Sequence, residues 1–116
     1  MRSEQSHILA SLARIHVDDL DAAVPFYSGL TGETPHRFGF RDMDLAKVGS
    51  FLLVAGADEN VRSHAATLVV RGLYRLAEEI IERGGTLLEG PEPGPNGARL
   101  VARHPDGSVV EYIEVP

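Results

Sequence analysis

A glutamate interrupts an apolar strand near the C-terminus, in "HPDGSVVEYIEV" at 104–115. A tight turn over 104–107 leads into this strand, on which Val109, Glu111 and Ile113 share one face because strand side chains alternate. Burying a carboxylate between apolar residues costs free energy unless water, a cation or a metal ion meets it. Glu111 is therefore a candidate ligand anchor, acid or base, or metal ligand.

A strand near the N-terminus offers two further polar candidates. Leu12, Arg14 and His16 share one face of this strand, and the alternate positions face the helix that follows. Arg14 is a candidate ligand-binding residue, since a guanidinium can hold an anion with two hydrogen bonds. It is equally a candidate for a structural ion pair with Glu111. His16 is a candidate ligand-binding residue or an exposed residue at the strand end.

Aromatic and basic side chains alternate in "PHRFGFRDMD" at 35–44. Phe38 and Phe40 are candidate walls of a site for a planar ligand, although a plain amphipathic hairpin has the same pattern. Arg99 and Arg103 share a face of the penultimate strand. Arg103 is a further candidate ligand-binding residue, and solvent is the alternative environment for both arginines.

The composition excludes several classes of protein. The 116 residues are 43% hydrophobic and 24% charged, with no cysteine and a formal net charge of −6. Thiolate metal sites and disulfides are thereby excluded, and a nucleic-acid partner is not expected. No apolar run reaches the roughly 20 residues of a membrane helix, and the N-terminus lacks the apolar stretch of a signal peptide. These features predict a soluble, cytoplasmic protein without a membrane partner.

The two halves of the chain repeat one pattern at an offset of 53 residues, so that Val17 corresponds to Val70 and Gly32 to Gly85. Each half predicts a strand, a helix and three strands, and residues 90–97 predict a loop. The pattern favours an α+β domain of two βαβββ modules, about 8–57 and 64–116. The predicted elements are strands 9–17, 35–40, 43–48, 50–55, 66–70, 86–89, 98–103 and 108–115, with helices 19–28 and 73–81.

Two motifs resemble the vicinal oxygen chelate superfamily of glyoxalase I, bleomycin-resistance proteins and dioxygenases. "VDDLDAAVPFYSGLTGE" resembles its first-helix signature, and "RHPDGSVVEYIEV" resembles its closing hairpin, with His104 in place of the usual first aspartate. The resemblance implies that Phe26 and Tyr27 pack the helix on the sheet. It also implies a concave, cup-like mixed sheet formed by the two modules, and a homodimer.

The resemblance implies four metal-ligand positions, and this sequence departs from them. Leu12, Leu53 and Ala65 occupy three positions, and only Glu111 can donate a lone pair. One carboxylate is too few donors for a catalytic metal. A one-residue slip would instead bring His64 to the site, which leaves His16, His64 and Glu111 as an alternative metal set.

The function that follows is small-molecule binding by a superfamily member with a degenerate metal site, as in antibiotic or ligand sequestration. No cofactor is expected, with a divalent metal as the alternative. Two enzymatic alternatives stay open: a metal-dependent lyase, isomerase or dioxygenase with a displaced ligand set, and a metal-free enzyme with Glu111 as general base. The expected partners are a small molecule and a second copy of the chain.

Overall fold

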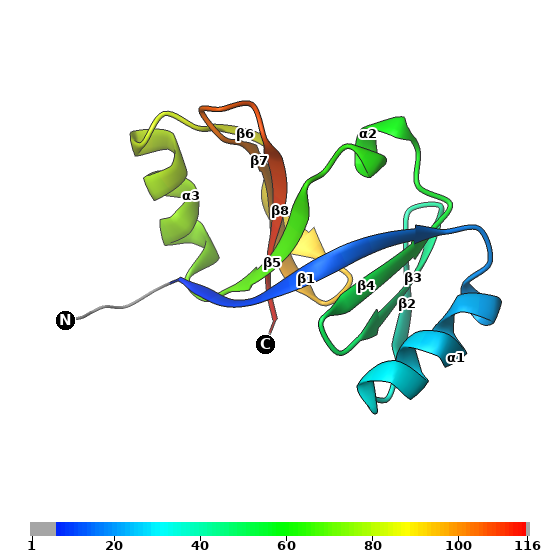
Figure 1. Ribbon diagram of the computed structural model, residues 1–116. Coiled ribbons are helices and arrows are strands. Elements are labelled where there is room, and N and C mark those ends of the chain that lie inside the picture. Colours follow the sequence, from blue (N-terminus) through cyan, green and yellow to red (C-terminus); the bar gives the residue numbers. More distant parts are fainter. Residues whose placement is uncertain (1–6, 116) are drawn as a thin grey trace. The chain divides into compact units, whose positions relative to one another are not determined.

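The computed structural model describes residues 7–115. They form two compact units, each with a four-stranded sheet and a helix on one face of it (Figure 1). One unit comprises Leu12–Ser63, and the other comprises the residues from His64 onward together with those up to Ser11.

The Leu12–Ser63 unit has the strand order β2-β3-β4-β1. β1 and β4 run parallel, and the β2–β3 and β3–β4 pairs are antiparallel. Its elements are β1 (Ile8–Val17) from Leu12 onward, α1 (Leu20–Thr31), β2 (His36–Phe40), β3 (Met43–Val48), β4 (Phe51–Ala55) and the short α2 (Glu59–Arg62).

Helix α1 begins and ends at residues suited to those places. The Asp19 carboxylate accepts hydrogen bonds from the backbone N–H groups of Asp21 and Ala22, which lack partners inside the helix. Gly32 ends the helix with a φ of 72° and donates its N–H to the Ser28 carbonyl. The helix therefore runs three residues beyond the predicted end at residue 28.

One face of α1 packs on the sheet, and Phe26 is not part of it. Leu20 and Val24 are buried against β3 and β4, and Tyr27 packs beside them. These three residues follow the helical repeat, whereas Phe26 lies one position off that face and is 65% exposed. The expected packing is confirmed for Tyr27 and wrong for Phe26.

The second unit has the strand order β5-β8-β7-β6. β5 and β8 run parallel, and the β6–β7 and β7–β8 pairs are antiparallel. Its elements are β5 (Ala66–Val70), α3 (Leu73–Glu82), β6 (Thr86–Gly94), β7 (Gly97–Arg103) and β8 (Val109–Glu114).

Helix α3 begins without a side-chain cap of its own, because its N-cap residue is Gly72. The Glu114 carboxylate, from the end of β8, accepts hydrogen bonds from the N–H groups of Gly72 and Leu73 at 3.1 and 3.2 Å. A negative charge at a helix N-terminus is favourable. Glu114 thereby ties the helix to the last strand.

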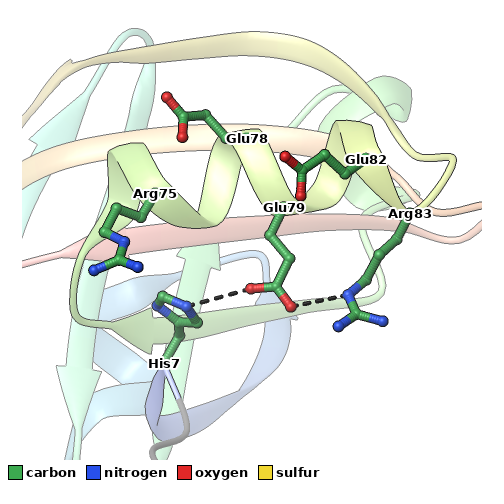
Figure 2. A pocket seen from close by; sticks show the side chains of 6 residues that line it. All are labelled: His7, Arg75, Glu78, Glu79, Glu82 and Arg83. Atoms are coloured by element: carbon green, nitrogen blue, oxygen red, sulfur yellow. Dashed lines mark hydrogen bonds and ion pairs between the residues drawn. The ribbon is translucent and has the colours of Figure 1, made fainter.

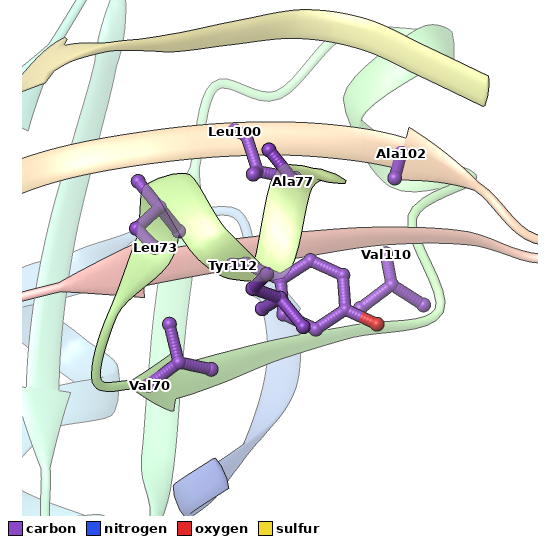
Figure 3. Packing of buried hydrophobic residues seen from close by; sticks show 8 residues of the cluster. Val70, Leu73, Ala77, Leu100, Ala102, Val110 and Tyr112 are labelled. Carbon is purple, nitrogen blue, oxygen red and sulfur yellow. The ribbon is translucent and has the colours of Figure 1, made fainter. Parts of the chain in front are cut away.

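The core of this unit lies between α3 and one face of its sheet (Figure 3). The helix contributes Leu73, Leu76 and Ala77. The strands contribute alternate residues, which leaves the residues between them on the opposite face. The strand residues of this core are Val70, Leu100, Ala102, Val110 and Tyr112.

The structure also has a strand where a loop is predicted and a short helix that is not predicted. Residues 90–97 were expected to form a loop from their proline and glycine content, but β6 continues to Gly94 and only a short turn separates it from β7. Pro91 lies within the register shift between Glu89 and Glu92, whereas Pro93 pairs in register with Ala98. Helix α2 has four residues and no apolar pattern that would predict it.

The predicted α+β class and the repeated βαβββ order are confirmed. The predicted turn over 104–107 is present, with hydrogen bonds from Gly107 N–H to the His104 carbonyl and from His104 N–H to the Ser108 carbonyl. Among residues 7–115, no helix has the length and apolar character needed to cross a membrane.

Candidate functional site

Glu111 lies on the sheet face opposite α3, since its neighbours Val110 and Tyr112 point into the helix-side core. It stands beside Thr67 of β5 in the parallel register. The Thr67 hydroxyl, which is fully buried, donates a hydrogen bond of 2.9 Å to Oε1 of Glu111. One oxygen of the carboxylate is thereby held by the protein's own chain.

The second oxygen of Glu111 accepts a hydrogen bond from Arg99. The distance from Nε of Arg99 to Oε2 of Glu111 is 3.2 Å. Nη1 of the same guanidinium lies 2.8 Å from Oε1 of Glu89 and 2.8 Å from Oε2 of Glu92. One cation therefore joins three carboxylates, and we call Arg99, Glu89, Glu92, Glu111 and Thr67 the Arg99 cluster.

The arginine is the most enclosed charge of this cluster. The Arg99 side chain is 4% exposed, against 15% for Glu111 and 40% for Glu92. Burial by itself lowers the pKa of Arg99, but the hydrogen bond to Glu89 and the charge of Glu111 outweigh it and raise the pKa above its usual value. The guanidinium is therefore a permanent positive charge.

The strand β6 brings two carboxylates to this face by its irregular register. Glu92 stands opposite Arg99 and Glu89 stands opposite Val101, with register shifts on either side of Glu89. Such shifts change which face a side chain points to. The sequence predicts that Arg99 and Arg103 share a face but does not single out Glu89 and Glu92. Glu92 falls in the predicted loop 90–97, and Glu89 is the last residue of the predicted strand 86–89.

β5 pairs with β8 without the one-residue shift that would bring His64 to the site of Glu111. Thr67 faces Glu111, whereas the residues on either side of it, Ala66 and Leu68, pack against the helix-side core. His64 is buried but precedes the strand. β5 therefore pairs with β8 in the unslipped register, with Thr67 on the Glu111 face.

The position in the first unit that corresponds to Glu111 is corrected by one residue. Leu53 packs against α1, whereas Glu111 lies on the face of its sheet that is opposite the helix. Arg14 and Thr67 are equivalent residues, because they are separated by the repeat offset of 53. Arg14 pairs with Leu52 on β4, and Thr67 pairs with Glu111 on β8. Leu52 is therefore the equivalent residue, and it too has no lone pair to donate.

These residues do not fit the metal ion that the superfamily resemblance implies. Three of the four positions hold Leu12, Leu52 and Ala65, and both oxygens of Glu111 accept hydrogen bonds within the Arg99 cluster. Within the described part of the chain, no three His, Asp or Glu side chains are grouped so as to hold a metal ion. No chemical step is therefore derived through a metal, and the alternative set of His16, His64 and Glu111 stays a prediction.

Arg14 and His16 lie on the face of the first sheet that is opposite α1, as predicted, since Ile15 and Val17 pack against the helix side. The Arg14 Nη2 group lies 3.5 Å from the Val61 carbonyl. His16 is half-buried, and its Nδ1 atom is shielded from solvent without a hydrogen-bond partner. The alternative of a solvent-exposed His16 is therefore wrong.

The charges near His16 act against its protonation. Burial lowers the pKa of His16 first, and the positive charges of Arg14 and Arg62 lower it further. Its imidazole is therefore neutral near pH 7. The predicted ion pair between Arg14 and Glu111 joins different units and stays a prediction.

Phe38 shares the face of Arg14 and His16 in the first sheet. The strand registers connect His16 to Val54, Val54 to Leu45, and Leu45 to Phe38.

The side chains of His36 and Phe40, on either side of Phe38 along β2, also make ring contacts. The His36 ring stacks on Phe38 with centroids 5.5 Å apart, and the Arg41 guanidinium lies 4.7 Å from the centroid of Phe40. Arg103 is exposed at the end of β7. The roles of Phe38, Phe40 and Arg103 in ligand binding stay predictions.

A separate hollow of about 310 Å³ lies along α3, on the other side of its sheet from Glu111 (Figure 2). Charged and titratable side chains line it. Glu79 is central, because its carboxylate is 3.3 Å from Nε2 of His7 and 2.8 Å from Nε of Arg83. Among the described residues, those that line it are all charged or titratable, whereas a second hollow of the same volume that shares His7, Glu79 and Arg83 also has apolar walls. The lining residues are His7, Arg75, Glu78, Glu79, Glu82 and Arg83.

No protein-family model matches the sequence, and no curated protein matches it significantly. Among solved structures, an uncharacterized protein from Methanosarcina mazei is 35% identical over 94% of both chains, with a TM-score of 0.86. Methylmalonyl-CoA epimerase from Mycobacterium tuberculosis is 19% identical over 99% of this chain and 93% of its own, with a TM-score of 0.73. A second methylmalonyl-CoA epimerase structure is 17% identical over 97% and 99%, with a TM-score of 0.65.

The two epimerases share the fold of this chain, which confirms the fold class that the sequence predicts. Within that class, the chain belongs to the same family as the protein from Methanosarcina mazei. The epimerases are too distant in sequence to indicate more than the fold.

Proposed function

We propose that the protein binds a small molecule without a metal ion, on the sheet face that carries the Arg99 cluster. One observation carries this proposal: both oxygens of Glu111, the only superfamily ligand position with a lone pair, accept hydrogen bonds from Thr67 and Arg99. A carboxylate held in this way presents a fixed polar group rather than an open metal ligand.

The Arg99 cluster suits a preformed binding site. Four hydrogen bonds fix its charged groups before any ligand arrives. A site already fixed in its binding geometry loses less entropy when it binds. The carboxylates of Glu89 and Glu92 remain partly exposed, so a polar group of a ligand can reach them. Half-buried Val109 and Ile113 flank Glu111 and supply apolar contact on the same face.

In the full proposal, the remaining candidate residues complete the ligand site: Arg14, His16, Phe38, Phe40 and Arg103. A second copy of the chain would contribute to the site in a homodimer. Sequestration of an antibiotic or a similar compound is the specific form of the proposal, since a metal-free binder needs only affinity.

The two enzymatic alternatives have less support. A metal-dependent lyase, isomerase or dioxygenase requires donors that converge, and the described residues offer no such group of three. A general base requires a carboxylate oxygen directed at the substrate, whereas each oxygen of Glu111 already accepts a hydrogen bond from the protein.

The test is a ligand screen of metal-free protein. A compound library is screened by thermal shift in EDTA, and hits are titrated by calorimetry against the unmodified protein, Glu111→Gln and Glu82→Gln. Glu82 is the matched control, because it is exposed on α3, on the other side of the sheet from Glu111. We expect hits whose affinity falls at least tenfold in Glu111→Gln and is unchanged in Glu82→Gln. The proposal would be refuted by hits that bind only with an added divalent metal, or by hits whose affinity is the same in Glu111→Gln as in the unmodified protein.

A further inference from the structure

Two hollows adjoin along α3, and residues of the second unit form both of them. Each has a volume of about 310 Å³, and they share three lining residues: His7, Glu79 and Arg83. One hollow extends from these shared residues among the charged side chains of α3 (Figure 2). The other extends from them toward apolar side chains of β1, α3 and β8. We call the two hollows together the α3 groove.

Four side chains from three elements form the apolar wall of the α3 groove. Leu76 and Tyr112 are 9% and 6% exposed, so most of their surface is already packed in the core. The Tyr112 hydroxyl lies 2.7 Å from Nε2 of His104, so its polar atom already has a partner. The apolar body of a ligand can therefore lie against this wall without leaving that hydroxyl unpaired. The four residues of the wall are Ile8, Leu76, Ile80 and Tyr112.

The three residues that the hollows share contact one another. Oε1 of Glu79 lies 3.3 Å from Nε2 of His7, and Oε2 of Glu79 lies 2.8 Å from Nε of Arg83. His7 is also held from its other side, because its Nδ1 atom lies 3.1 Å from the Arg71 carbonyl. Both oxygens of Glu79 thus have partners within the protein, and the charges that can pair with a ligand lie elsewhere in the lining.

The remaining charges of the lining favour a cationic ligand. Glu78 and Glu82 lie one turn apart on α3, and both are exposed. Neither forms an ion pair with another residue of 7–115. Arg75, which also forms no ion pair within that range, opposes them with a single positive charge. The formal net charge of −6 on the whole chain adds to the attraction for a cation.

We propose that the α3 groove binds an organic cation, namely a small molecule with one ammonium group on an apolar body. The ammonium group lies beside the carboxylates of Glu78 and Glu82, and the apolar body lies against the apolar wall. The α3 groove is separate from the Arg99 cluster, because α3 packs on the face of its sheet that is opposite Glu111. This second site goes beyond the proposed function and does not depend on it.

The experiment compares three compounds that share an apolar body and differ in charge: phenethylamine, phenethyl alcohol and phenylpropionate. Each is titrated at pH 8, where an ordinary imidazole is neutral, and binding is followed by the NMR shifts of the backbone amides. The proteins, all without histidine tags, are the unmodified chain, the double variant Glu78→Gln/Glu82→Gln, Ile8→Ser and Glu33→Gln. Glu33 is the matched control, because it is an exposed glutamate of the other unit. Circular dichroism establishes that each variant is folded.

We expect phenethylamine to bind the unmodified chain at least fivefold more tightly than either comparison compound, and to shift the amides of residues that line the α3 groove. The double variant should lower the affinity for phenethylamine at least fivefold and leave that for phenethyl alcohol unchanged. Ile8→Ser should weaken the binding of both compounds, because it removes an apolar contact that they share. Glu33→Gln should match the unmodified chain.

The proposal is overturned if phenethyl alcohol or phenylpropionate binds as tightly as phenethylamine. It is also overturned if the double variant keeps the full affinity for the amine, or if the shifted amides lie outside the α3 groove. The double variant changes only exposed side chains, so we expect it to fold. Glu111→Gln should leave the binding of phenethylamine unchanged, which separates failure of this site from failure of the proposed function.

Discussion

Replacing Arg99 with methionine tests the ion network through the stability of the fold. Methionine keeps an unbranched stem of similar length but removes the charge, so Glu89, Glu92 and Glu111 lose their shared cation. Removing one partner of a buried ion pair costs about 3–5 kcal/mol, because the other charge remains buried and uncompensated. Since Glu92 is 40% exposed and therefore partly solvated, we expect the lower end, about 3 kcal/mol.

This change is measured by urea unfolding followed with far-UV circular dichroism. For a chain of this size it corresponds to a fall in Tm of about 12 °C. The exposed Arg75→Met should stay within about 0.5 kcal/mol of the unmodified protein. In a double-mutant cycle, Arg99→Met and Glu111→Gln should couple by about 1–3 kcal/mol. An Arg99→Met protein as stable as the unmodified one would refute the reasoning, because the cluster would then be a solvated surface pair.

Three further predictions concern other parts of the two units. Glu114→Ala should cost about 1–2 kcal/mol in urea unfolding, since the first N–H groups of α3 lose their acceptor, and an unchanged stability would contradict that role. The free energy of unfolding should fall as the pH drops through 6.5, because the lowered pKa of His16 means that the unfolded chain takes up the proton first. His16→Gln should reduce this slope between pH 7 and 5, and an equal slope in both proteins would contradict the assignment. Gly94→Ala should cost about 1–3 kcal/mol by displacing the Arg99 stem, and a crystal structure of the variant with Arg99 unmoved would count against that contact.

The sequence predicts those parts of the structure that depend on regular periodicity. Alternation along β1 and β8 correctly separates Arg14, His16 and Glu111 from the residues that pack against the helices. The apolar residues of the predicted helix 73–81 include Leu76 and Ala77, which are in the core, and Ile81, which is 56% exposed. Repetition of one pattern at a fixed offset correctly indicates two βαβββ modules, because each strand and helix carries its own apolar signal.

The site depends on irregularities that periodicity does not encode. Glu89 and Glu92 are three residues apart, so a regular strand would place them on opposite faces. The register shifts of β6 bring both to Arg99, and a regular alternation does not predict where such shifts occur. The error at Leu53 has a similar origin, because it is the strand pairing that makes Leu52, and not Leu53, equivalent to Glu111. Phe26 follows the superfamily motif in type but not the packing face of α1.

Calorimetric titration of Zn²⁺, Ni²⁺, Mn²⁺ and Fe²⁺ into the unmodified, tag-free protein decides whether Glu111 serves a metal ion. With Thr67 and Arg99 bonded to its oxygens, we predict no saturable binding at millimolar concentrations and no metal retained after purification. Near-stoichiometric binding that disappears in Glu111→Ala would contradict the metal-free site and would restore chelate chemistry with a displaced ligand set.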